Sequence, residues 1–141
     1  MHLACHGFFL SDNPDFAGLH VTSGEGRPEM LWYSDVARER SRARLVTLGA
    51  CYVGTGEVRY GSEYVGLPGA FLASGAHTVL APLNAVDDEV TARLMAMFYP
   101  AYLDSGSPAR ALRQARLSLA TEPSNAAHER SWTAFQIFGL P

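Results

Sequence analysis

Two residues capable of nucleophilic and acid–base chemistry stand at the ends of two apolar segments. His6 and Gly7 close the segment 2–6, and Cys51 follows the apolar segment 44–50. A thiol becomes a fast nucleophile when a nearby imidazole takes its proton, because the thiolate is the reactive form. Ligands of open α/β sheets bind at the carboxyl ends of the strands, where both residues are expected to lie. The sequence therefore indicates a His6/Cys51 dyad.

A structural interpretation of the same residues stays open. Cys51 can be a small buried hydrophobe and His6 a hydrogen-bonded core histidine, and their spacing does not decide between the two. In the catalytic interpretation Gly7 has a use, because a backbone N–H without a neighbouring Cβ can approach a developing oxyanion. The N–H of Cys51 would be the second donor of that oxyanion hole.

Other candidates carry less chemistry. Adjacent residues of a strand point to opposite faces, so Cys5 is expected in the core and not beside His6. His2 shares a face with His6, but no third ligand stands at a suitable spacing, so we predict no metal site. Gly54 and Gly56 lack the third glycine of a dinucleotide fingerprint and the lysine of a phosphate loop. No cofactor is predicted.

The elements that must position the dyad alternate between strand and helix. Apolar and β-branched runs predict strands over 2–6, 44–50, 77–83 and 132–138, and helical spacing predicts helices over 64–74, 90–103 and 107–120. Two β-prone pieces, 19–22 and 30–33, predict a hairpin-like excursion, followed by a short helix from Ser34 or Asp35 to Arg42. Loops are expected at 8–18 and after Cys51, where Gly54, Gly56 and Gly61 stand. This order predicts an α/β fold with a largely parallel sheet.

Length and composition limit the function classes. The 141 residues, 48% hydrophobic, fit one soluble domain over 1–141, and a net charge of −3 argues against a nucleic-acid partner. The basic run from Arg38 to Arg44 is interpreted as a solvated helix face. We expect no membrane partner and no secretion, because no apolar run reaches about 18 residues and no leader precedes 2–6. Two cysteines without a secretory signal predict a reduced, cytoplasmic setting.

The sequence resembles the CHAT family of caspase-like cysteine peptidases of clan CD, which are often fused to tetratricopeptide repeats. The resemblance runs in order along nearly the whole chain. It rests on the segments around the histidine and the cysteine, 2–8 and 45–56, and on 66–76, 86–91, 94–95, 98–99, 111–115, 132–135 and Gly139. The spacing typical of caspases, with a histidine about 50 residues before an Ala-Cys pair, fits His6 and Ala50-Cys51.

The resemblance implies a caspase-like three-layer sandwich and a peptidase acting on protein or peptide substrates through His6 and Cys51. It also implies an upstream regulatory segment in a larger parent protein. The abrupt start at 1–6 leads us to expect a carboxyl-terminal portion of the domain, truncated at the amino terminus. In similar peptidases an acidic side chain past the cysteine strand helps to bind a basic substrate residue, and Asp88 stands there. Asp87 or Asp88 is equally well interpreted as a helix N-cap.

Three positions depart from the family pattern: Tyr52 stands where an acidic residue is common, Gly49 where serine is usual, and Asn84 where tryptophan is common. These departures, with the expected truncation, keep a second hypothesis open, a CHAT-like interaction module with little or no protease activity. A third, a thiol hydrolase or redox protein of another α/β family, lacks any C-x-x-C motif.

Overall fold

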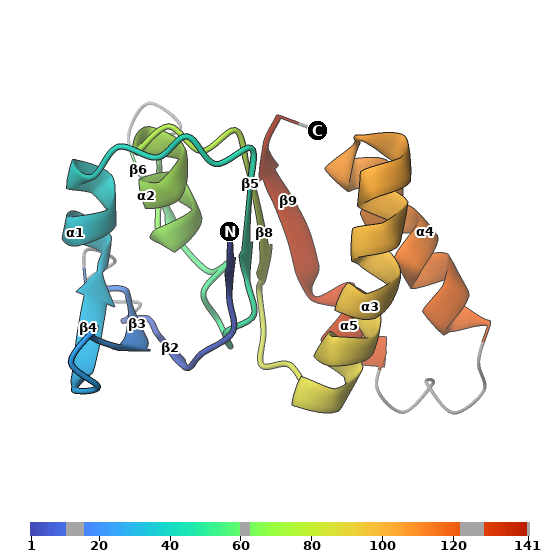
Figure 1. Ribbon diagram of the computed structural model, residues 1–141, viewed down its shortest axis with the longest axis horizontal. Helices are drawn as coiled ribbons and strands as arrows, with labels where there is room; N and C mark the ends of the chain where they lie inside the picture. The colour runs from blue at the N-terminus through green and yellow to red at the C-terminus, as the bar shows by residue number, and fades with distance from the viewer. Residues whose placement is uncertain (11–15, 60–62, 122–128, 141) are drawn as a thin grey trace.

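The structure is a computed structural model that describes residues 1–10, 16–59, 63–121 and 129–140. The expected loop residues 11–15 and Gly61 lie outside this part of the chain. Within it the fold is mixed α/β, with a four-strand, mostly parallel sheet and five helices (Figure 1). The alternation of strands and helices in the sequence predicted this class.

The four-strand sheet has the order β1-β5-β8-β9. Its strands are β1 (His2–Leu3), β5 (Leu45–Leu48), β8 (Thr78–Pro82) and β9 (Phe135–Gly139). β1 and β8 flank β5 in parallel, whereas β9 runs antiparallel to β8. The two central strands are fully buried, as continuous apolar runs covered on both faces should be.

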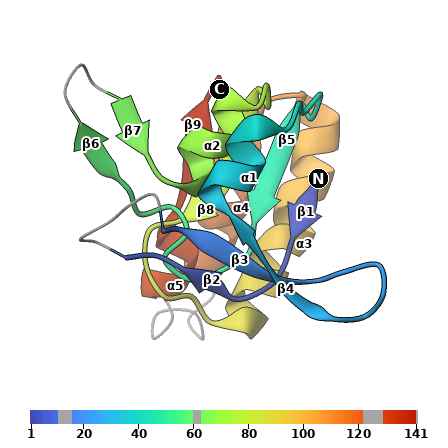
Figure 2. The same cartoon turned by 90° about the vertical axis from the view of Figure 1, so that its left-hand side faces the viewer.

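Two small antiparallel sheets complete the strands. One contains β2 (Gly7–Phe8), β3 (Gly18–Thr22) and β4 (Pro28–Trp32), and its β3–β4 hairpin is the predicted excursion. The other contains β6 (Glu57–Arg59) and β7 (Glu63–Val65), which projects from the rest of the molecule (Figure 2). β7 takes up the first residues of the expected helix over 64–74, so that prediction was wrong at its amino end.

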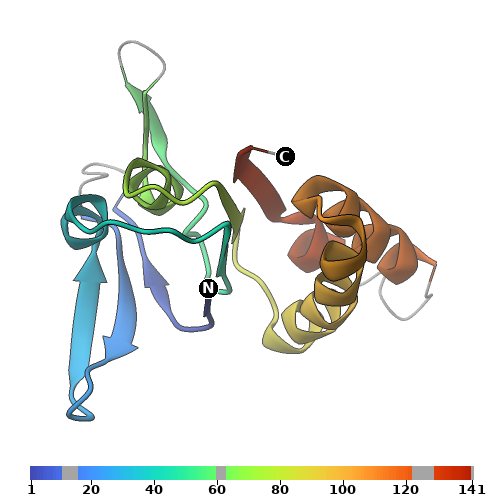
Figure 3. The same cartoon turned by 45° about the horizontal axis from the view of Figure 1, so that its top comes forward.

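Helices cover both faces of the four-strand sheet (Figure 3). One face carries α1 (Tyr33–Arg38) and α2 (Leu67–Ala73); the other carries α3 (Asp88–Ser105), α4 (Pro108–Ala120) and α5 (Glu129–Thr133). α4 begins as predicted, with the Ser107 hydroxyl accepting the Arg110 N–H at 3.4 Å. None of the described helices is both long enough and apolar enough to cross a membrane.

Three local predictions need correction. The helix expected to run to Arg42 ends at Arg38, so most of the basic run lies in exposed chain after it. The N-cap position of this helix is Trp32, not Ser34 or Asp35. Asp35 lies in the first turn, where its carboxylate accepts the backbone N–H of Trp32. The last strand was expected from Trp132, which instead belongs to α5.

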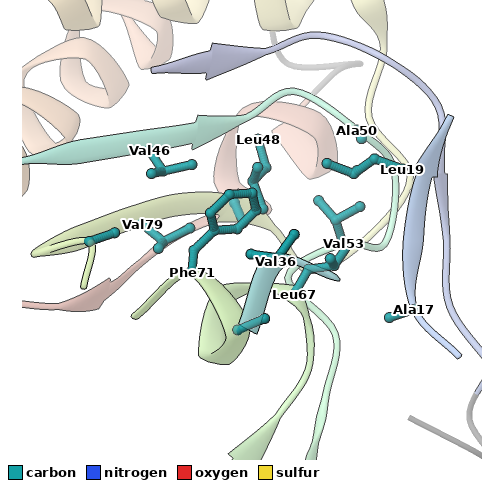
Figure 4. Close-up of a cluster of buried hydrophobic side chains, with 13 residues drawn as sticks. Ala17, Leu19, Val36, Val46, Leu48, Ala50, Val53, Leu67, Phe71 and Val79 are labelled. Atoms are coloured by element: carbon teal, nitrogen blue, oxygen red, sulfur yellow. The ribbon is translucent and has the colours of Figure 1, made fainter. Parts of the chain in front are cut away.

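The core has two apolar clusters, one on each face of the sheet. Val46 and Leu48 of β5 join the cluster under α1 and α2 (Figure 4), while Leu45 joins the cluster under α3 and α4. In β8, Val79 and Leu80 divide between the two clusters in the same way. The alternation is that of a strand, whose successive side chains point to opposite faces. Packing on both faces therefore holds β5 in place, and with it the edge of the sheet where β1 and β5 end.

Candidate active site

The carboxyl ends of β1 and β5 open into a cleft of about 630 Å³, which also takes in the start of α3. We call it the His–Cys cleft. Its side chains capable of chemistry are His2, Cys5, His6, Cys51, Asp87 and Asp88. The two residues predicted as a dyad, and the acidic residue predicted beside them, therefore line one cavity. No group of three or more His, Cys, Asp or Glu among the described residues is arranged to hold a metal ion.

Strand pairing brings the histidine and cysteine segments together. His2 is paired with Thr47 and Leu3 with Leu48 in the parallel ladder. The alignment continues past the strand ends, where the Gly49 N–H donates to the Leu3 carbonyl at 2.8 Å. The ladder ends at Leu3 and Leu48, and the chain continues from there to His6 on one side and Cys51 on the other. Two residues that are 45 apart in the sequence therefore line the same cleft.

Gly7 fits closely against the loop that carries Cys51. A Cβ on Gly7 would lie 2.8 Å from the Cys51 carbonyl oxygen and would collide with Cγ1 of the buried Val53. Contacts this short with backbone do not occur for real Cβ atoms, so the position requires glycine. The chain around His6 and Gly7, which we call the histidine segment, is thus packed closely on the chain around Cys51 and Val53, which we call the Cys51 loop.

The pairing of β2 with β3 also sets the direction of the Gly7 amide. Gly7 stands opposite Leu19, and the next bond of the ladder runs from the His20 N–H to the His6 carbonyl at 2.9 Å. That pattern defines Gly7–Leu19 as a non-hydrogen-bonded pair of an antiparallel ladder. In such a pair both N–H groups point away from the partner strand. The Gly7 N–H therefore faces away from β3.

Backbone hydrogen bonds tie the loop after Cys51 to the end of β8. Gly54 N–H donates to the Pro82 carbonyl at 2.8 Å, and Tyr52 N–H donates to the Asn84 carbonyl at 3.3 Å. Tyr52 has φ 59°, the left-handed region that residues with a Cβ rarely adopt. Its side chain is 52% exposed. The residue next to Cys51 thus holds a strained backbone, a feature that clusters at functional sites.

The Cys51 thiol lies against the backbone of Val86. Its Sγ is 3.7 Å from the Val86 carbonyl oxygen, to which it donates, and 3.5 Å from the Val86 nitrogen, from which it accepts. The His6 side chain is exposed, and no hydrogen bond joins its ring to this thiol among the described residues. The two groups therefore share the cleft, and the thiol is hydrogen-bonded to the Val86 backbone and not to the imidazole.

The two aspartates at the start of α3 have different roles. Asp87 is the N-cap: its Oδ1 accepts the Val90 N–H at 3.0 Å. Asp88 is the first helical residue, exposed and lining the cleft, with no capping bond. The structure therefore assigns the cap to Asp87 and leaves Asp88 exposed in the cleft.

Two further residues, Cys5 and His2, line the cleft, and the prediction for Cys5 was only partly right. Cys5 packs against the core as expected, but it also lines the cleft beside His6, because the chain leaves regular strand geometry after Leu3. Burial raises the pKa of the Cys5 thiol. The His2 ring lies 5.7 Å from the Tyr99 ring, and burial, then the charge of the terminal amine, lowers the pKa of His2. For Cys5, the signal available in the sequence was its position near the end of the strand expected over 2–6.

The fold and the cleft define an α/β protein that presents a histidine and a cysteine at the carboxyl edge of a mostly parallel sheet. The family model for the CHAT domain matches residues 1–140. The chain therefore belongs to the CHAT domain family, which is generally peptidase-like. No curated protein matched the chain.

Proposed function

We propose that this chain is a cysteine endopeptidase domain, with a caspase-like three-layer fold over 1–141, that cleaves peptide bonds through His6 and Cys51. The observation that carries the proposal is the His–Cys cleft, which both side chains line at the carboxyl ends of β1 and β5. Ligands bind at this edge in open α/β sheets. Membership of a peptidase-like family makes peptide hydrolysis the chemistry best matched to a thiol and an imidazole there.

In the proposed reaction His6 takes the thiol proton and Cys51 Sγ attacks the peptide carbonyl carbon. The carbonyl oxygen becomes an oxyanion that accepts hydrogen bonds from the N–H groups of Gly7 and Cys51. Collapse of this intermediate breaks the C–N bond as His6 protonates the leaving amine. Water, deprotonated by His6, then attacks the thioester, releasing the carboxylic acid and restoring the thiol.

The direction of the Gly7 amide supports its place in this scheme. The amide faces away from β3, so the ladder does not use it, and Gly7 packs on the loop that carries the proposed nucleophile. Asp88 supports a preference for a basic residue before the cleaved bond, since a carboxylate forms a charge-assisted hydrogen bond with arginine or lysine. Its exposure makes that preference modest, because solvent screens such a pair.

A second candidate is a CHAT-like interaction module with weak or no activity. It is favoured by the Cys51 thiol, whose hydrogen-bonding partner is the Val86 backbone and not the His6 ring. Under either candidate we propose a protein or peptide partner in the cytoplasm, and a regulatory segment such as a tetratricopeptide array upstream of the domain. In the first candidate, binding of substrate or of that segment draws His6 and Cys51 together.

An irreversible cysteine-directed peptide probe with a basic P1 residue tests the proposal. The chain, alone and with its upstream coding region, is incubated with the probe and the modified cysteine is found by mass spectrometry. Cys51→Ala should abolish labelling and His6→Ala should slow it by about 100-fold or more. Cys5→Ala is the matched control, because it removes the other thiol of the cleft.

The outcomes separate the candidates. Labelling at Cys51 that depends on His6 supports the peptidase. Labelling that persists in folded Cys51→Ala protein refutes this nucleophile, and a Cys51 that never reacts faster than a free thiol, with or without the upstream region, favours the interaction module.

A further inference from the structure

The segment between β8 and α3 carries the backbone groups that hold the Cys51 thiol. The Val86 carbonyl accepts a hydrogen bond from the thiol at 3.7 Å, and the Val86 N–H donates to Sγ at 3.5 Å. The next residue, Asp87, donates its N–H to the hydroxyl oxygen of Ser131 at 3.1 Å. Ser131 belongs to α5, which lies beside the start of α3 (Figure 1), and it does not line the His–Cys cleft. The proposed mechanism gives it no role.

One peptide group connects the Ser131 hydroxyl to the thiol. The Val86 carbonyl and the Asp87 N–H belong to the same planar peptide unit, in which C=O and N–H point in opposite directions. One end of the unit therefore meets Cys51 and the other end meets Ser131. A rotation of the unit that broke one of these hydrogen bonds would also break the other. The Ser131 hydroxyl thus fixes the direction of the carbonyl to which the thiol donates.

Asp87 is held on its other side by α3. Its Oδ1 accepts the Val90 N–H at 3.0 Å, and its carbonyl accepts the Thr91 N–H at 2.9 Å. The Asp87 N–H lies on the far side of the Cα from that carbonyl, and its acceptor among the described residues is the Ser131 hydroxyl. Loss of the hydroxyl would therefore free the 86–87 peptide while the cap of α3 remained.

We propose that Ser131 is a positioning residue that restrains the Cys51 thiol by orienting the Val86 carbonyl. A carbonyl oxygen accepts a hydrogen bond from a thiol but not from a thiolate, so this contact favours the protonated sulfur. The carbonyl therefore competes with the His6 ring for the thiol proton. The importance of this restraint for catalysis rests on the proposed peptidase function, but the state of the thiol can be measured without it.

The S–H stretching band of Cys51 tests the restraint directly, because its frequency rises when the thiol loses its hydrogen bond. The chain has two cysteines, so Cys5→Ala leaves the band of Cys51 alone. In that background Ser131→Ala should move the band to higher frequency, because the carbonyl is no longer held toward the thiol. Ser131→Thr keeps a hydroxyl and should keep the original frequency. Ser118→Ala, the same change at an exposed position of α4, should leave the band in place.

The rate of alkylation by iodoacetamide, followed by mass spectrometry, measures the consequence for reactivity. In the chain with both thiols, Ser131→Ala should speed alkylation of Cys51 by about 2–10-fold, the change expected when one hydrogen bond to the thiol is lost. Ser131→Thr should react at the wild-type rate. Cys5 in the same sample is the internal control, and its rate should not change.

A second pair of variants keeps the test independent of folding. Alanine favours helix more than serine does, so Ser131→Ala should retain α5. If that variant fails to fold, Ser131→Val replaces it and is compared with Ser131→Thr. Valine has the shape of threonine without the hydroxyl, so the difference between the two isolates the hydrogen bond.

Four results would overturn the proposal. They are an unchanged S–H band in folded Ser131→Ala protein, unchanged alkylation of Cys51 in that protein, a Ser131→Thr variant that behaves like Ser131→Ala, and equal acceleration of Cys5 and Cys51.

Failure of this proposal and failure of the peptidase are distinguishable. A band that shifts as expected, in a chain whose Cys51 never reacts with the peptide probe, would keep the Ser131 restraint and refute the peptidase. An unchanged band in a chain whose Cys51 is labelled through His6 would refute only the restraint.

Discussion

Gly7→Ala is the most informative single substitution, because Gly7 packs the chain next to His6 against the loop that carries Cys51. The added Cβ would lie 2.8 Å from the Cys51 carbonyl oxygen, 3.3 Å from the Ala50 Cβ and in collision with Val53. Val53 is 1% exposed and has no room to turn away. The strain must therefore move backbone, either the histidine segment or the cysteine loop.

The expected cost follows from this overpacking. One extra carbon in a closely packed site lowers the free energy of unfolding by about 1–3 kcal/mol. With a urea dependence of about 2 kcal/mol per M for a chain of this size, the unfolding midpoint should fall by about 0.5–1.5 M. Displacement of the thiol from the histidine should also slow labelling of Cys51 by about tenfold or more.

Urea unfolding followed by circular dichroism measures the first effect, and the basic P1 probe measures the second below the unfolding transition. Gly24→Ala is the matched control. A Cβ there would meet nothing within 4 Å, so its midpoint should be unchanged or slightly higher. If Gly7→Ala unfolds at the wild-type urea concentration and labels at the wild-type rate, the close packing of the histidine segment on the Cys51 loop is refuted.

Three further predictions concern the same region. Asp87→Ala should lower the free energy of unfolding by about 0.5–2 kcal/mol, because it removes the hydrogen bond from the Val90 N–H. Asp88→Ala should leave thermal stability unchanged and reduce only the preference for a basic over a neutral P1 probe. Equal stability loss in both variants would contradict the assignment of the cap. Tyr52→Gly should raise the melting temperature relative to Tyr52→Ala, because φ 59° costs a residue with a Cβ about 1–2 kcal/mol. Burial raises the pKa of Cys5, so above the ordinary thiol pKa the folded state keeps a proton that the unfolded state loses. The free energy of unfolding should therefore fall as the pH rises through that range. The fall should be less steep in Cys5→Ala, which lacks this thiol, than in Cys51→Ala, which keeps it. Identical alkaline slopes in those two variants would contradict a perturbed Cys5.

Local pattern was enough for several elements. The run at 44–50 predicted β5 because a strand covered on both faces needs apolar residues at every position. Ser107-Pro108 predicted the start of α4 because capping is decided within one turn. The direction of the last strand could not be predicted in this way, because the residue types of a strand do not show which way it runs. Its pairing with β8 shows that it is antiparallel.

The sequence by itself determined the α/β class, the family resemblance and the positions of His6 and Cys51 at the ends of apolar segments, since these depend on residue type and order. The tertiary structure decided which groups share the cleft. The ladder between β1 and β5 aligns the two segments, the chain leaves strand geometry early enough to bring Cys5 into the cleft, and one of two adjacent aspartates becomes the cap. The need for glycine at position 7 also comes from packing, because the carbonyl and side chain that exclude a Cβ lie 44 and 46 residues away in sequence.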